Sequence, residues 1–201
     1  MGDSVDFGEF LGGIRTVDLV LFIYFIGFFV LGFAQGTLRR LIGIGSILFS
    51  FFFAANLAEP LGIFLGNNWT QFDRQYSFMV GFGTVFVAAA LAFALVAQGF
   101  YKPQPLFEKA RFVDELLGGL LGVVQAAIIL GAVVIILGTF FLVPGIPERG
   151  TELPFLRELW VFLEGSAIVD IFQANLIPAF FAVTGFLVPD TMEVFYPGTS
   201  A

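Results

Sequence analysis

The sequence predicts an all-α integral membrane protein, with four transmembrane helices arranged as two antiparallel hairpins and an amphipathic or re-entrant segment after them. Apolar residues make up 58% of the 201 residues and charged residues only 12%, and the mean hydropathy is +0.95. Soluble domains carry about 25% charged residues. The apolar residues are also gathered into long uncharged runs, and about 20 such residues suffice to cross a hydrocarbon core of about 30 Å.

Residues 1–17 form an acidic tail before the first run. The tail contains Asp3, Asp6 and Glu9 but a single cation, Arg15. Its few apolar residues recur at helical spacing, which predicts a segment that lies in the membrane interface.

The first two spans are expected at about 18–34 and 41–58. The loop between them is short and contains Arg39 and Arg40, so the two helices should form an antiparallel hairpin. Glu59 and Pro60 should end the second helix, because proline cannot donate the next backbone hydrogen bond. Residues 61–68 are then expected to return loosely toward water.

The third and fourth spans are expected at about 77–98 and 116–142, and they complete a four-helix membrane domain over 18–143. The loop between them is basic, with Lys102, Lys109 and Arg111. This loop and the first one hold most of the cations of the chain, and the positive-inside rule places such loops in the cytoplasm. We therefore expect a multi-pass protein with both termini outside.

Residues 144–201 should form a linker and an amphipathic C-terminal segment. Prolines and charges predict a solvated linker over 145–158, and apolar spacing predicts a short amphipathic helix over 153–163. The stretch 166–188 has the length of a span but contains Asp170, Gln173, Asn175 and Pro178, which are costly in bulk lipid. An interfacial or re-entrant segment is favoured over a fifth crossing.

A glycine pattern in the fourth span predicts close helix packing. Gly118, Gly122 and Ala126 fall on one helix face, and Gly119 begins a second smooth ridge beside it. In lipid, helices associate through van der Waals contact and a few hydrogen bonds, so small residues mark their interfaces. The alternative is that glycine and alanine are simply common in membrane helices.

Charged groups at the span boundaries form a second set of candidates. Asp18 and Asp114 each begin a span, where a carboxylate complements the helix dipole. A more specific alternative pairs Asp114 with Arg39, Arg40 or Arg111 across the cytoplasmic loops.

Amides near or inside the spans form a third set, namely Gln35, Asn56, Gln98 and Gln125. Hydrogen bonding between helices is their ordinary role, because an unpartnered amide is expensive in lipid. A polar track for ions or a peptide is the alternative. Glu59 is the first choice for a protonatable site in such a track.

Two absences restrict the chemistry. The chain has no cysteine and no histidine, which removes the usual zinc sites, histidine-ligated haem, and triads with an imidazole base. We expect no enzyme activity, no metal and no other cofactor, and the lipid bilayer rather than nucleic acid as a partner.

Two groups of residues together resemble the colicin V production protein family. The first group is Asp18, Gly32, Gly36, Leu38, Arg39 and Leu41, and the second is Asp114, Leu117, Gly118, Gly122 and Ala126. The resemblance covers about residues 17–190. It implies a four-span bacterial inner-membrane protein with a role in envelope maintenance and in the export of, or tolerance to, secreted peptide toxins. The stretch with Gly118 and Gly122 is then one half of a paired sequence signature, matched by Asp18 with Gly32 and Gly36 in the first span, and we interpret it as an assembly surface.

The chain departs from the family pattern at three positions. Gln35 and Gln125 stand where the family usually has basic residues, so a role of those charges is in doubt. Arg40 stands where an acid is common, and it makes the loop more suited to anionic headgroups.

The leading hypothesis is therefore a non-enzymatic envelope protein that packs with itself or with a larger membrane complex through its glycine faces and outer amphipathic tail. The alternative is a small channel or transporter that uses Glu59 and the intramembrane amides. An intramembrane hydrolase is the least favoured, because no spacing places a nucleophile beside a base.

Overall fold

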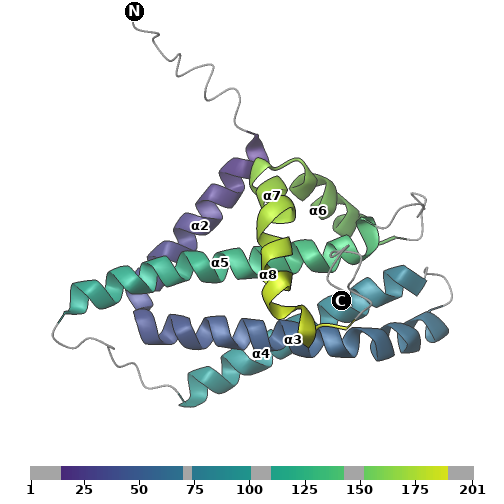
Figure 1. Cartoon of the computed structure of the whole chain (residues 1–201), viewed down its shortest axis with the longest axis horizontal. Helices are drawn as coiled ribbons and strands as arrows, with labels where there is room; N and C mark the ends of the chain where they lie inside the picture. The colour runs from purple at the N-terminus through teal and green to yellow at the C-terminus, as the bar shows by residue number, and fades with distance from the viewer. Residues whose placement is uncertain (1–14, 70–73, 101–109, 143–151, 190–201) are drawn as a thin grey trace, which may run out of the picture.

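The computed structural model describes residues 15–69, 74–100, 110–142 and 152–189, with the side chains of 98–100 left out of the description. The expected acidic tail lies almost wholly outside these residues, as does the side chain of Gln98. Figure 1 shows that the described chain is built from helices, and no strand occurs within the described ranges. The predicted all-α class is confirmed.

Four long helices form the body of the protein. They are α2 (Thr16–Gln35), α3 (Thr37–Asn68), α4 (Arg74–Phe100) and α5 (Arg111–Phe141). Each contains a window that is apolar and long enough to cross a bilayer. The four predicted runs thus correspond to helices. Helices α2, α3 and α4 extend beyond both predicted limits, and α5 begins five residues earlier than predicted.

The expected loop over residues 35–40 is wrong, because a single residue joins α2 to α3. Gly36 has a φ of +76°, a backbone conformation that residues with a side chain rarely adopt. Its backbone N–H donates to the carbonyl oxygen of Gly32. Helix α3 begins at the next residue, Thr37. One glycine therefore ends one helix and turns the chain directly into the other.

The expected end of the second helix at Pro60 is also wrong. Helix α3 continues through Pro60 to Asn68. Tertiary packing explains the continuation: Ala58 is fully buried, and a Cβ added at Gly62 would lie 2.9 Å from the Cα of Phe78 in α4. This contact with α4 offsets the one backbone hydrogen bond that proline removes.

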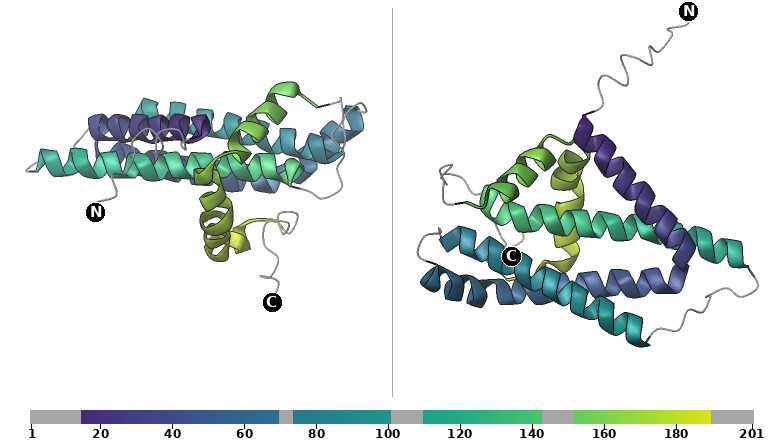
Figure 2. Two further views of the ribbon diagram at one scale, coloured as in Figure 1. Left: turned by 90° about the horizontal axis from the view of Figure 1, so that it is seen from above. Right: turned by 180° about the vertical axis from the view of Figure 1, so that it is seen from behind.

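The long helices pair differently from the two predicted hairpins. Helix α3 lies along α4, while α2 packs chiefly against α5 and contacts α3 little beyond their joint. Figures 1 and 2 show α2 crossing α5 obliquely. The sharp turn at Gly36 directs α2 away from α3, so these two helices are not main packing partners although they follow one another in sequence.

The C-terminal part is helical almost throughout its described length. It comprises α6 (Pro154–Glu164), α7 (Ala167–Ile171), the π-helical η1 (Phe172–Leu176), α8 (Ile177–Thr184) and the 3₁₀ turn η2 (Gly185–Leu187). The predicted amphipathic helix over 153–163 matches α6. Residues from α7 to η2 run across α5 toward α3 (Figure 1) and protrude from the layer of long helices (Figure 2).

The stretch 167–187 is a fifth segment with the length and composition of a span. Its polar residues Asp170 and Asn175 are exposed rather than packed against protein. A π-helical turn precedes Pro178, and such turns accommodate the missing proline N–H inside a helix. The chain thus has five helical segments able to cross a bilayer, and four crossings with a re-entrant or interfacial segment stays a prediction.

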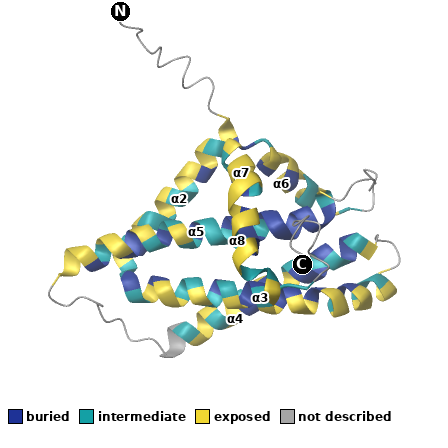
Figure 3. Cartoon of the chain, in the orientation of Figure 1, coloured by how far each residue is buried: buried dark blue, intermediate teal, exposed yellow. Residues whose placement is uncertain are grey.

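Burial concentrates on α5. In Figure 3 the C-terminal half of α5 is the longest continuous buried stretch, and it includes Val134 and Phe140. Large apolar side chains point outward from the other helices, such as Ile23 at 60% and Leu95 at 68% exposed. An outer surface of this kind fits lipid. Because its C-terminal half is the most buried stretch, α5 is the central helix around which the others pack.

Candidate functional site

The crossing of α2 and α5 is closed by glycines. A Cβ added at Gly32 would lie 2.2 Å from the carbonyl oxygen of Gly118, and a Cβ at Gly118 would lie 2.5 Å from that of Gly32. Contacts below 3.0 Å of this kind leave no room for any side chain. The two helix backbones therefore touch directly, as small residues permit in membrane helices.

The contact extends from Gly32 toward the N-terminus of α2. A Cβ at Gly122 would lie 2.2 Å from the carbonyl oxygen of Phe28, and one at Gly119 would lie 2.8 Å from the ring of Phe29. Ala126 is fully buried, and its carbonyl oxygen accepts a hydrogen bond of 3.0 Å from the Tyr24 hydroxyl. The first smooth ridge of α5 and the start of the second, at Gly119, are thus in contact with α2.

This placement corrects the expectation that the glycine faces join one copy of the protein to another. Gly32, Gly36, Gly118, Gly122 and Ala126 are brought together within one chain. Their faces are already covered by backbone, so a second helix cannot reach them. Any assembly must use other parts of the surface.

A polar contact closes the end of the same crossing. The hydroxyl of Thr37 donates to the backbone carbonyl oxygen of Asp114 at 2.9 Å, and both residues are 5% exposed. The Asp114 carboxylate lies against Gly36, where an added Cβ would be 2.6 Å from its Oδ2 atom. Asp114 therefore has a packing role at the helix joint, whereas the exposed Arg111 pairs with Glu115 at 2.8 Å.

Arg40 of α3 and Gln125 of α5 form a direct link between two of the predicted polar residues. The guanidinium Nη1 of Arg40 donates to Oε1 of Gln125 at 2.6 Å, and the guanidinium lies 5.8 Å from the ring centroid of Phe28. Arg40 is only 5% exposed, and its Nε has no hydrogen-bond partner. A buried cation is thus held by a neutral amide.

A cavity of about 620 Å³ lies beside this pair, between α3, α4 and α5. One part of its lining is polar, with Gln35, Arg39, Arg40, Ser46 and Gln125. The rest of the lining is apolar and includes Ile47, Phe86 and Leu91. The structure therefore gathers Gln35, Gln125, Arg39 and Arg40 around one space.

Asp18 belongs to a separate contact at the other end of α2. The Ser166 hydroxyl donates to Oδ1 of Asp18 at 2.5 Å, and it accepts from the backbone N–H groups of Ile168 and Val169. Ser166 is the N-cap of α7. Arg15 donates to the Gly165 carbonyl oxygen nearby. Asp18 thus ties the start of α2 to the start of α7.

Glu59 and Asn56 lie apart from the cavity. Glu59 is exposed on α3 and is not in the cavity lining. The Asn56 amide donates to the carbonyl oxygens of Phe52 and Leu187, at 2.8 and 3.1 Å. Glu59 follows Arg40 by 19 positions on one helix, which is about 28 Å at 1.5 Å per residue. The structure does not join Glu59 to Gln35 and Gln125.

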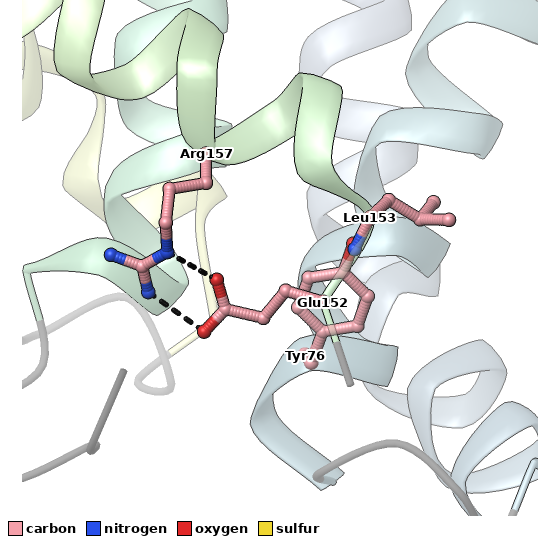
Figure 4. Close-up of polar contacts among 4 residues, drawn as sticks. All are labelled: Tyr76, Glu152, Leu153 and Arg157. Atoms are coloured by element: carbon pink, nitrogen blue, oxygen red, sulfur yellow. Dashed lines mark hydrogen bonds and ion pairs between the residues drawn. The ribbon is translucent and has the colours of Figure 1, made fainter. Parts of the chain in front are cut away.

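A further anchor holds α6 against the ends of α4 and α5 (Figure 4). Arg157 donates to both oxygens of Glu152, at 2.5 and 2.7 Å, and the Tyr76 hydroxyl accepts from the backbone N–H of Leu153 at 2.8 Å. The Glu152 side chain is only 8% exposed. Residues 152–158 are therefore docked, which corrects the prediction of a solvated linker for this part.

Sequence reasoning assigned no contact or role to Tyr24, Thr37 or Ser166. Ser166 was detectable, since a serine before an apolar helical run is an N-cap signal. Tyr24 and Thr37 give no comparable signal, because their partners are backbone carbonyl oxygens of a helix about 80 to 100 positions away. Within the described ranges, no group of three acidic residues is placed to hold a metal ion.

One comparison with known proteins identifies the family of the chain. The family model of the colicin V production protein matches residues 17–178, from the first turn of α2 into α8. No curated protein and no solved structure shows a significant match. Since the match covers most of the chain and includes both glycine-bearing helices, the chain belongs to the colicin V production protein family.

Proposed function

We propose that the chain acts as a non-enzymatic protein of the bacterial inner membrane, in envelope maintenance or in the production and export of a peptide toxin. The family match over residues 17–178 carries this proposal, because it covers nearly the whole helical body. Four long apolar helices, and a fifth segment of similar character, support a multi-pass membrane location. Both termini are proposed to lie outside, from the distribution of cations among the loops.

The absence of histidine and cysteine from the sequence supports a non-enzymatic role. Two hydroxyl groups that could act as nucleophiles, those of Thr37 and Ser166, make structural contacts instead. Thr37 donates to a helix carbonyl oxygen, and Ser166 caps α7 and binds Asp18. A protein of this kind acts by binding and positioning other molecules.

Assembly with itself or with a larger membrane complex is part of the proposal. The glycine crossing supplies a rigid body for such an assembly rather than its contact surface. The contact surface then lies among the apolar side chains that point outward from α2, α3 and α4.

The alternative of a channel or transporter has one observation in its favour, the polar part of the cavity between α3, α4 and α5. A transport path would run through this cavity, past Arg40 and Gln125, and would not include Glu59. The channel hypothesis therefore rests on the cavity with Arg40 and Gln125 and no longer on the Glu59 carboxylate.

Complementation of a strain that lacks the gene tests the proposed function. The wild-type gene should restore the secreted toxin titre or the resistance of the envelope to detergent, and Gly118→Leu should restore neither. Gly27→Leu is the matched control, because an added Cβ at Gly27 meets nothing within 4 Å. Failure of the wild-type gene to change either readout would overturn the proposal. Native mass spectrometry of the purified protein then distinguishes a self-assembly from a complex with other proteins.

A further inference from the structure

Arg40 is a buried cation that has no anionic partner in the described part of the chain. It is 5% exposed, its one recorded hydrogen bond goes to the neutral amide of Gln125, and its Nε is unpaired. A guanidinium carries five N–H donors, and leaving them unmet in a buried place is costly. Such a group in a membrane protein marks a functional site by default.

The local helix structure adds to this cost. Arg39 and Arg40 both lie in the first turn of α3, which contains no acidic residue. The first turn of a helix carries the positive end of its dipole and favours anions. Two cations are therefore placed where the helix dipole disfavours them. The Asp114 carboxylate lies against Gly36 at this end of α3, and a further anion bound at the two arginines would offset both effects.

The cavity supplies the space for such an anion. Arg39, Arg40 and Gln125 contribute polar groups to one part of its lining, and Gln35 lies with them. Arg39 is exposed and Arg40 is buried. An oxyanion in the cavity would therefore meet one accessible cation and one desolvated cation. Guanidinium groups bind phosphate oxygens in this way, often through two parallel hydrogen bonds.

The remaining lining decides the class of the ligand. The cavity walls include Ile47 and Phe86, which are buried, and Leu91, which is 60% exposed on the outer face of α4. A small hydrophilic anion gains nothing from such walls, whereas an acyl chain does. Basic pockets between membrane helices bind anionic lipid headgroups in this arrangement.

We propose that the cavity between α3, α4 and α5 binds an anionic phospholipid, with its phosphate at Arg40 and Arg39 and an acyl chain against the apolar wall. Gln125 orients the Arg40 guanidinium for this contact, and the ring of Phe28 lies beside the guanidinium. This inference does not depend on the proposed role in toxin export or envelope maintenance.

Lipid retention by the purified full-length protein tests the proposal. The protein is exchanged into nanodiscs of phosphatidylcholine with a minor fraction of phosphatidylglycerol, and the co-purified lipid is quantified by native mass spectrometry. Wild type should be enriched in phosphatidylglycerol. Arg40→Gln should lower this enrichment roughly tenfold, the effect expected from losing one charge-assisted contact. Arg111→Gln is the matched control, since it removes an equal charge from an exposed position outside the cavity.

Equal loss in Arg40→Gln and Arg111→Gln would overturn the proposal, because general attraction to a basic surface would then explain the binding. Unchanged enrichment in Arg40→Gln would overturn it as well. In a parallel arm, inorganic phosphate is added as a competitor. If free phosphate displaced the lipid fully, the apolar wall would contribute nothing to lipid binding.

A second variant guards against loss of folding in Arg40→Gln. Ala90→Phe fills the apolar part of the cavity and leaves both arginines intact, because Ala90 belongs to the lining. It should lower phosphatidylglycerol retention, whereas Ala92→Phe, on an exposed part of the same helix outside the lining, should not. Retention that is the same in these two variants would place the lipid elsewhere and overturn the assignment.

Discussion

Gly32 in α2 and Gly118 in α5 are in backbone contact, so that a Cβ added to either would lie within 2.5 Å of the carbonyl oxygen of the other. The contact holds α2 against α5 at the point where the chain turns into α3. It therefore fixes the positions of three helices at once. The cavity that contains Arg40 and Gln125 lies next to this fixed point.

Substitution of Gly118 by alanine should destabilise the protein strongly. The methyl group would collide with the backbone of Gly32 and Gly36, at 2.5 to 2.9 Å, and backbone cannot move aside as a flexible side chain can. Overpacking costs about 1–3 kcal/mol, and a backbone clash should reach the upper end of this range. Unfolding in detergent measures the effect. Gly27→Ala has open space around its Cβ and should be close to neutral.

Tyr24→Phe tests the hydrogen bond between α2 and α5. The substitution removes the hydroxyl that donates to the Ala126 carbonyl oxygen at 3.0 Å and keeps the ring. Hydrogen bonds between membrane helices contribute about 0.6 kcal/mol on average, so a loss of this size in the free energy of unfolding is expected. Thr184→Val is the control, because the Thr184 hydroxyl bonds within its own helix. A larger effect in the control would contradict this assignment.

Ser166→Ala should loosen the start of α7 without unfolding the body. The variant loses the cap to the backbone N–H groups of Ile168 and Val169 and the contact with Asp18. Loss of an N-cap costs about 1 kcal/mol. Hydrogen exchange of the amides at 168–171 should become faster, while exchange in α5 stays the same. Glu164→Gln, an exposed change just before the cap, should leave both regions unaffected.

Glu152→Gln should release α6 from the ends of α4 and α5. The bidentate pair with Arg157 is lost, and the remaining guanidinium is only partly solvated, at 32% exposed. Trp160 reports the change, since it is 4% exposed and stacks on Phe141 at 5.6 Å. Its fluorescence should shift to longer wavelength in a Trp69→Phe background. Glu115→Gln breaks an exposed pair with Arg111 instead and should give no shift.

Glu59→Gln should leave both stability and any ion or peptide flux unchanged. Glu59 is exposed on α3 and lies outside the cavity lining. Flux into liposomes is the measurement, with Arg40→Gln as the comparison, because Arg40 does line the cavity. Flux that depends on Glu59 but not on Arg40 would restore the original form of the channel hypothesis.

The sequence determined the class of protein and the positions of its long helices. Uncharged apolar runs must be helical in lipid, because helices satisfy their own backbone hydrogen bonds. The same reasoning identified Gly118, Gly122 and Ala126 as a packing face. It also drew attention to Gln125, where the family's basic residue is absent.

Only the tertiary structure decided which helices meet. A periodic pattern shows that a face is smooth and does not show its partner, so Gly118 was assigned to another copy although Gly32 of the same chain covers it. Pro60 gave a local signal for a helix end, and packing of Gly62 against Phe78 overrode it. Arg40 and Gln125 are 85 positions apart, and only folding around the α2–α5 contact brings the charge, the amide and the cavity together.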